Sequence, residues 1–247
     1  MVEIEKVIAD SWNAYKKGWK KIGTYTFFIF IIIGILYLLT LLSFTISFYL
    51  GGIICLIYLF ISLTLPAGLL HLYNLSFTKK KIKLKLLFDF ISKNWIKILK
   101  VSILQFLIIA CIFSPIFISL AFYYSTESLI YLFLVILFSF ISFLISLFFV
   151  FPIYSFVIEK LSTINCIKRS VYIVKNNYFS LIVLYFAITL LALFSSIIVL
   201  PLFLLFVISI ILIPFAIILI ILYLFYFIIP LTYFIFISFY RNAIKRH

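Results

Sequence analysis

The residue types that most often carry enzyme or metal chemistry are scarce in this chain, and none is spaced for it. There are six acidic residues, two histidines (His71 and His247) and three cysteines (Cys55, Cys111 and Cys166). A nucleophile needs a base within reach, and a zinc site needs clustered Cys or His ligands. The sequence contains no Cys-x-x-Cys, no paired Cys and His, and no glycine-rich phosphate loop. We therefore expect no catalytic residue, no metal, no cofactor and no disulfide framework.

Basic residues, by contrast, are abundant and clustered. The 20 Lys and Arg residues give the chain a formal net charge of +14. They fall within residues 6–21, 79–100, 160–175 and 241–246. A basic residue near a membrane surface is attracted to anionic lipid by roughly 1 kcal/mol, although such a run can also serve as a topology signal alone. The candidate contacts for anionic lipid headgroups are Lys79, Lys80, Lys81, Lys83 and Lys85.

The amino-acid composition indicates what kind of structure carries these basic clusters. Of the 247 residues, 68% are hydrophobic and 11% are charged, against about 45–50% and about 25% in an ordinary soluble domain. We expect an all-α integral membrane protein. Residues 1–23 carry acids and lack an apolar core, so we expect no cleaved signal peptide. A soluble protein this basic would suggest nucleic acid as a partner, but here the basic residues flank hydrophobic runs, and we expect none.

Three basic segments repeat one spacing of apolar residues. Leu84, Phe88, Ile91 and Trp95 lie at offsets 0, 4, 7 and 11, which places them in one stripe along a helix. The same offsets pick out residues 8, 12, 15 and 19, and residues 167, 171, 174 and 178. The next apolar step also matches, at Ile22, Ile98 and Leu181. The aromatic members that we expect to anchor these helices at headgroup level are Trp12, Trp19, Trp95 and Tyr178.

We interpret this pattern as one membrane domain of three tandem units, about residues 1–78, 79–160 and 161–247. Each unit would hold an interfacial amphipathic helix followed by a transmembrane hairpin. Pro66, Pro152 and Pro230 recur near the end of the second span of each unit, which favours duplication. Basic loops and scattered prolines would, however, occur in any six-span protein.

Uncharged runs of the chain are long enough to cross a hydrocarbon layer of roughly 30 Å at about 1.5 Å per helical residue. The first two, residues 24–50 and 53–73, should be joined by a turn at Gly51 and Gly52. The next two, residues 101–124 and 129–158, flank a polar turn, and Ser162 or Thr163 should cap the helix that follows. Residues 180–240 carry no charge and should hold the last outer turn between Pro201 and Pro214.

Parity decides how many spans this last region holds. With six spans in total, all four basic clusters fall on the cytoplasmic side of the membrane, whereas seven would leave the C-terminal cluster outside. We therefore predict six spans in the cell membrane, both termini cytoplasmic, and a basic collar on the inner surface. Gln105 is the most polar side chain within a span, and we interpret it as an interhelical hydrogen bond in preference to a ligand contact.

Short sequence motifs near the basic segments resemble those of a known family. They are KKGWKKI (16–22), SKNWIKI (92–98), RSVYIVKNNYFSL (169–181) and the terminal FISFYRNAIK (236–245). With its proline-containing returns, the chain resembles the six-span membrane domain that is attached to some glycerophosphodiester phosphodiesterases. It also resembles related stand-alone prokaryotic membrane proteins of unknown function. The resemblance implies fold and location. The phosphodiesterase catalytic barrel has no counterpart in this sequence, so no catalytic residue carries over.

These observations favour a non-enzymatic module. We expect it to organise lipid, or to dock a membrane or cytoplasmic protein, through its basic collar, with anionic membrane lipids as partners. The alternative is a permease or lipid transporter for an apolar or amphiphilic substrate, because no buried charge is present in the spans to handle ions. An intramembrane enzyme is the least favoured class, for lack of candidate groups.

Overall fold

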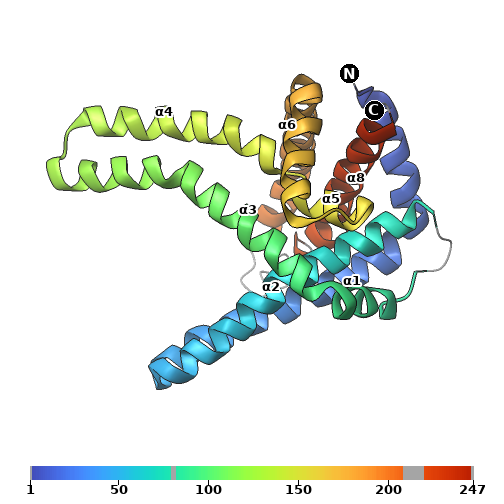
Figure 1. Cartoon of the computed structure of the whole chain (residues 1–247), viewed down its shortest axis with the longest axis horizontal. Coiled ribbons are helices and arrows are strands. Elements are labelled where there is room, and N and C mark those ends of the chain that lie inside the picture. Colours follow the sequence, from blue (N-terminus) through green and yellow to red (C-terminus); the bar gives the residue numbers. More distant parts are fainter. Residues whose placement is uncertain (1, 79–81, 208–219, 246–247) are drawn as a thin grey trace. The chain divides into compact units, whose positions relative to one another are not determined.

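The structure is a computed structural model that describes residues 2–78, 82–207 and 220–245, and in this part the chain is all-α, as predicted (Figure 1). In chain order the elements are α1 (Ile4–Ile46), α2 (Phe48–Ser76), α3 (Lys85–Thr126), α4 (Leu129–Ser146), the 3-10 turn η1 (Leu147–Phe149), α5 (Pro152–Glu159), α6 (Thr163–Val207), the π-helical turn η3 (Leu224–Ile228) and α8 (Ile229–Lys245).

Within the described ranges, six helical segments are long and apolar enough to cross a membrane. They are Ile4–Ile46, Phe48–Ser76, Lys85–Thr126, Leu129–Glu159, Thr163–Phe194 and Ile220–Lys245. By the length and composition of these helices the chain is a multi-pass membrane protein. The chain folds as two compact units, Met1–Lys93 with Asn177–His247, and Asn94–Asn176.

Helix α1 joins an amphipathic segment and a span that the sequence treats as separate elements. Its 43 residues run without a break through Gly23 and Thr24. The Thr24 and Thr26 hydroxyls donate to carbonyls four residues earlier, at 2.7 and 2.8 Å, which satisfies both side chains inside the helix. Gly23 allows close packing, because a Cβ there would lie 2.8 Å from the Tyr226 ring. The helix therefore crosses the expected boundary with both hydroxyls satisfied and with room for the Tyr226 ring against Gly23.

The turn between α1 and α2 differs from the prediction. It lies at Ser47, whose backbone is extended (φ −159°, ψ 133°), and Gly51 and Gly52 belong to α2. Gly51 is instead a packing position, since a Cβ there would lie 2.4 Å from Cδ1 of Phe44 in α1. The prediction of a Gly51–Gly52 turn is therefore wrong, because glycine here allows close approach of two helices and does not end one.

The core of the first unit lies where α1, α2 and α8 meet. Tyr73 of α2 is fully buried, and its hydroxyl lies 2.7 Å from that of Thr26 in α1. Its ring stacks on Tyr233 of α8, with ring centres 4.9 Å apart, and meets Phe234 edge-on. Tyr15 of α1 donates its hydroxyl hydrogen to the Tyr226 carbonyl at 3.0 Å. The core is thus aromatic, with each Tyr hydroxyl named here placed against a polar partner.

In the second unit the predicted return span, residues 129–158, is interrupted before Pro152. α4 ends at Ser146, η1 follows, and α5 begins at Pro152. Gln105 of α3 donates to the Phe149 carbonyl at 2.9 Å. Ser170 of α6 accepts from the Phe151 N–H at 3.1 Å and donates to the Phe148 carbonyl at 2.7 Å. Side chains from two other helices therefore satisfy the backbone groups that the break exposes, and the structural role predicted for Gln105 is confirmed.

Three further boundaries follow the sequence closely. The polar turn between α3 and α4 is present, with Glu127 in the left-handed region at φ 53°. α6 begins at Thr163, which places Ser162 at the N-cap position. α6 is kinked at Asn177 (φ −134°, ψ 25°), where the basic segment passes into the uncharged run. The helix continues to Val207, and the rest of the region predicted to hold the last outer turn, residues 208–219, lies outside the described residues.

Many Ser and Thr hydroxyls in the apolar helices donate to carbonyls of their own helix. Thr40 donates to Leu36 at 2.7 Å, and Thr64 donates to Phe60 at 2.8 Å. In α4, Ser139 donates to Val135 at 2.6 Å. These hydroxyls need no partner from another helix, so they can lie within an apolar span at little cost.

Candidate functional site

Two of the predicted anchors line up with lysines on α1. Lys16 Nζ lies 5.2 Å from the centre of the Trp12 ring, and Lys20 Nζ lies 5.6 Å from that of Trp19. Both tryptophans are exposed, whereas Tyr15 between them is 8% exposed and packs toward the core. An ammonium above an aromatic face gains about 0.5–1 kcal/mol at an exposed site. This face of α1 therefore presents cations held against aromatic rings, just before the uncharged run.

The other predicted contacts lie on α3 and α6. Trp95 on α3 is 43% exposed, and Tyr178, next to the α6 kink, is partly buried. Lys83 precedes α3 and Lys85 is its first residue, and both are exposed. Lys79, Lys80 and Lys81 lie outside the described residues.

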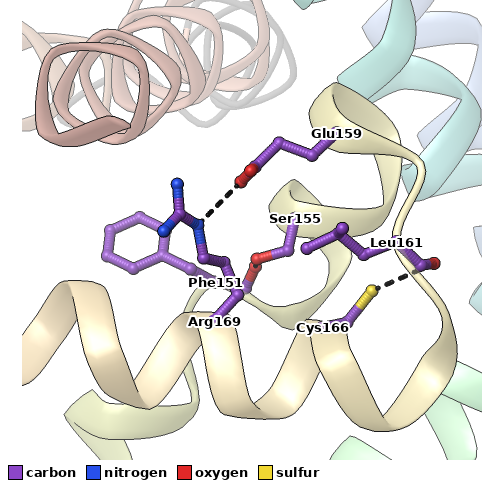
Figure 2. A network of polar contacts seen from close by, with 6 residues as sticks. All are labelled: Phe151, Ser155, Glu159, Leu161, Cys166 and Arg169. Carbon is purple, nitrogen blue, oxygen red and sulfur yellow. Dashed lines mark hydrogen bonds and ion pairs between the residues drawn. The ribbon is translucent and has the colours of Figure 1, made fainter. Parts of the chain in front are cut away.

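The basic residues of the third segment include one that is tied to an acid. Arg169 Nε donates to Glu159 Oε1 at 3.2 Å, with both side chains about three-quarters buried (Figure 2). Nearby, the buried Cys166 lies with Sγ 3.5 Å from the Leu161 carbonyl. These contacts tie the end of α5 to the first turns of α6. We therefore assign Arg169 a structural role, because its charge is already matched.

A polar cavity that the sequence reading missed lies in the first unit, between α1, the end of α2 and α8. Its volume is about 320 Å³. It is lined by Asp10, Asn13, Ala14, Lys17, Ser76, Phe77, Ser238, Arg241, Asn242 and Lys245. The lining of α1 and of α8 follows helical spacing, so each helix turns one polar face toward the cavity.

Contacts inside the cavity hold some of these groups in place. The Arg241 guanidinium lies 5.1 Å from the centre of the Phe77 ring, and its Nη1 is buried without a hydrogen-bond partner. Asn242 Nδ2 lies 3.4 Å from both Asp10 Oδ2 and Ser238 Oγ. Three basic side chains against one acid give the lining a formal charge of +2. The arrangement can hold an anion that accepts several hydrogen bonds.

A second cavity of about 370 Å³ is apolar and is formed by α1, α6, η3 and α8. Its lining residues include Trp12, Leu184, Ile188, Leu231 and Ile235. It can accommodate hydrocarbon but offers no group for chemistry. In the described part of the chain, no three His, Cys, Asp or Glu side chains come together as a metal-ligand group.

Comparisons of the chain with models of known protein families, with curated proteins and with solved structures find no match. The six long apolar helices are consistent with a six-span membrane domain. The resemblance to the domain attached to glycerophosphodiester phosphodiesterases stays a prediction, because no family is identified.

Proposed function

We propose that the protein is a non-enzymatic membrane module that gathers anionic lipids around a basic, aromatic-flanked surface. The observation that carries the proposal is the pairing on α1, where Lys16 and Lys20 lie over Trp12 and Trp19 directly before an uncharged run. Tryptophan favours the headgroup level, and lysine there attracts anionic lipid. Lys83 and Lys85, at the start of α3, are also exposed and available to anionic lipid. A protein that docks on the same surface is the other form of this proposal.

The test is to replace Lys79, Lys80, Lys81, Lys83 and Lys85 together with Gln. The protein is reconstituted in nanodiscs of mixed phosphatidylcholine and phosphatidylglycerol, and native mass spectrometry measures the lipids that stay bound. Each basic residue near the surface contributes roughly 1 kcal/mol, so the change to Gln should reduce phosphatidylglycerol enrichment and its sensitivity to salt. The matched control replaces the same five residues with Arg and should keep both. A second variant adds Lys16→Gln and Lys20→Gln to the five changes and should lower the enrichment further. Equal enrichment in this second variant and the natural chain would refute the proposal.

The alternative is a permease or lipid transporter for an apolar or amphiphilic substrate. The apolar cavity favours it, because Trp12 at its edge is exposed and the remaining lining is aliphatic or aromatic. A transporter should move substrate across proteoliposome membranes, and this flux should survive the five changes to Gln. A module that only gathers lipid should show none.

A further inference from the structure

The polar cavity brings together the two ends of the chain. Asp10 and Lys17 come from α1, whereas Arg241 and Lys245 come from α8, and Phe77 closes the cavity beyond the end of α2. All of them belong to the first compact unit. Three cations in a lining with one carboxylate repel one another unless an anion lies between them.

Arg241 has a buried donor, Nη1, without a hydrogen-bond partner. Its guanidinium lies over Phe77, with Cζ 5.1 Å from the ring centre. An unsatisfied buried donor on a charged group is costly, and such groups in native structures call for an explanation. An acceptor within the cavity would satisfy Nη1 without moving the guanidinium away from the ring.

Asp10 attracts the Arg241 guanidinium, but one carboxylate against three basic side chains leaves the lining positive. Asp10 Oδ2 faces the Asn242 amide at 3.4 Å, and the same amide faces Ser238 Oγ. Asp10 is thus held in a polar pair on one wall, while Lys17 and Lys245 complete the positive lining. Lys245 lies in the last turn of α8, where it also balances the helix dipole. The lining still holds two more positive charges than negative ones.

We propose that this cavity binds a phosphomonoester, with Arg241, Lys17 and Lys245 as the groups that recognise the dianion. A phosphomonoester carries a charge of about −1.5 to −2 at pH 7 and offers three strong acceptor oxygens, which match the excess charge and the several donors of the lining. The volume of about 320 Å³ lies at the lower end of ligand sites, roughly 300–1,000 Å³, and suits a headgroup or a small molecule. A phosphodiester, with one charge fewer, matches less well.

Two sources can supply this group: a lipid with a phosphomonoester headgroup, or a small soluble phosphomonoester. The lipid source rests on the proposed function and would make the cavity a selective site within the basic surface. The soluble source does not depend on it. The two are separated by offering phosphatidate in the bilayer, or glycerol 3-phosphate in solution to nanodiscs of phosphatidylcholine alone.

The experiment compares phosphatidate with phosphatidylglycerol, a diester lipid, in nanodiscs of the full chain, with native mass spectrometry as the readout. Calorimetry with glycerol 3-phosphate is the second arm. Preferential retention of phosphatidate supports the lipid source, and binding of glycerol 3-phosphate supports the soluble one. Equal retention of the two lipids together with no glycerol 3-phosphate binding would overturn the proposal.

Variants of lining residues test whether the phosphomonoester binds in the polar cavity. Lys17→Gln and Arg241→Gln should each weaken phosphomonoester binding about tenfold to a hundredfold, because each removes a charge-assisted contact. Lys17 is exposed, so its change leaves the core intact and keeps the test valid if Arg241→Gln folds poorly. Lys6→Gln is the matched control, since Lys6 is exposed on α1 but lies outside the lining. Unchanged binding in Lys17→Gln would refute the proposal.

This outcome is distinct from failure of the proposed function. The five changes to Gln at residues 79–85 should lower general enrichment of anionic lipid and leave the preference for a phosphomonoester intact. The cavity variants should lose the preference for a phosphomonoester and keep the general enrichment of anionic lipid. If the natural chain enriched anionic lipid in general but showed no preference for a phosphomonoester, this inference alone would fail.

Discussion

At the scale of single residues, several polar side chains replace backbone partners that a break or a proline has removed. Pro230 has no N–H to offer the Tyr226 carbonyl four residues earlier, and the Tyr15 hydroxyl donates to that carbonyl at 3.0 Å. Gln105 and Ser170 serve the same purpose at the break before Pro152. Such side-chain hydrogen bonds allow an irregular backbone within a membrane, because no water is present there to bond to its free N–H and C=O groups.

We predict that Gln105→Leu destabilises the protein by about 1 kcal/mol, because it leaves the Phe149 carbonyl without its side-chain donor. Unfolding in mixed micelles, followed by tryptophan fluorescence, measures the change in the free energy of unfolding. Ser114→Ala is the control, since the Ser114 hydroxyl bonds to Cys111 of its own helix and is exposed. Equal stability of the two variants would contradict the assigned role.

The sequence predicts part of this residue-scale picture. Gln105 stands out because it is polar within an apolar run, and its structural role could be inferred. Ser170 and Tyr15 do not stand out, because their importance depends on breaks in other helices. Which hydroxyl meets which carbonyl is fixed by tertiary packing, and local spacing does not contain that information.

At the scale of elements, glycines decide how closely helices approach. A Cβ at Gly68 of α2 would lie 2.7 Å from Ile91 Cδ1 and 2.8 Å from Leu87 Cγ, and Leu87 is fully buried. A Cβ at Gly52, in the same helix, would have no atom within 4 Å. The two positions therefore form a matched pair with opposite surroundings.

We predict that Gly68→Ala destabilises the protein by roughly 1–3 kcal/mol through overpacking against the start of α3. Gly52→Ala should be neutral or slightly stabilising, because alanine favours the helix and meets nothing there. Thermal unfolding followed by circular dichroism compares both variants with the natural chain. If Gly68→Ala unfolded at the same temperature as Gly52→Ala, close packing at Gly68 would not contribute to stability.

Helix positions follow from composition and charge, and helix boundaries follow from packing. The uncharged runs are visible in the sequence because lipid tolerates few charges, and the parity of the basic clusters divides the last run into two spans. The one-residue turn at Ser47 is not visible, since glycine in a span signals either a turn or close packing, and Phe44 decides between them. The three-unit repeat stays a prediction, although Ile22, Ile98 and Leu181, at matching offsets, are each fully buried.

At the scale of the whole molecule, the distribution of basic residues leads to a prediction of orientation. The two described turns that join consecutive spans, at Ser47 and at Glu127, should face the outside. With Cys55, Cys111 and Cys166 replaced by Ser, Ser47→Cys and Glu127→Cys should react with an impermeant thiol reagent applied to intact cells. Lys83→Cys is the control and should react only after the membrane is opened. Labelling of Lys83→Cys alone in intact cells would reverse the orientation.

At this scale, the polar cavity could not be predicted from the sequence. Its walls come from residues 10–17 and 238–245, far apart in the chain. The helical spacing of Asp10, Asn13 and Lys17, and of Ser238, Arg241 and Lys245, was available as a signal of two polar faces. The fold brings the two faces together. No local feature of the sequence indicates that α1 packs against α8.

The hydroxyls that bond within their own helix have a consequence for how the chain is made. In the α1–α2 hairpin, Thr40 and Thr64 are satisfied as soon as their own turns form. This hairpin can therefore leave the insertion machinery and enter lipid before any later helix has been synthesised. The aromatic contacts with α8 can form only later, because α8 follows the other described helices in the chain. Insertion and assembly are separate stages for this chain, and the polar cavity is completed in the second.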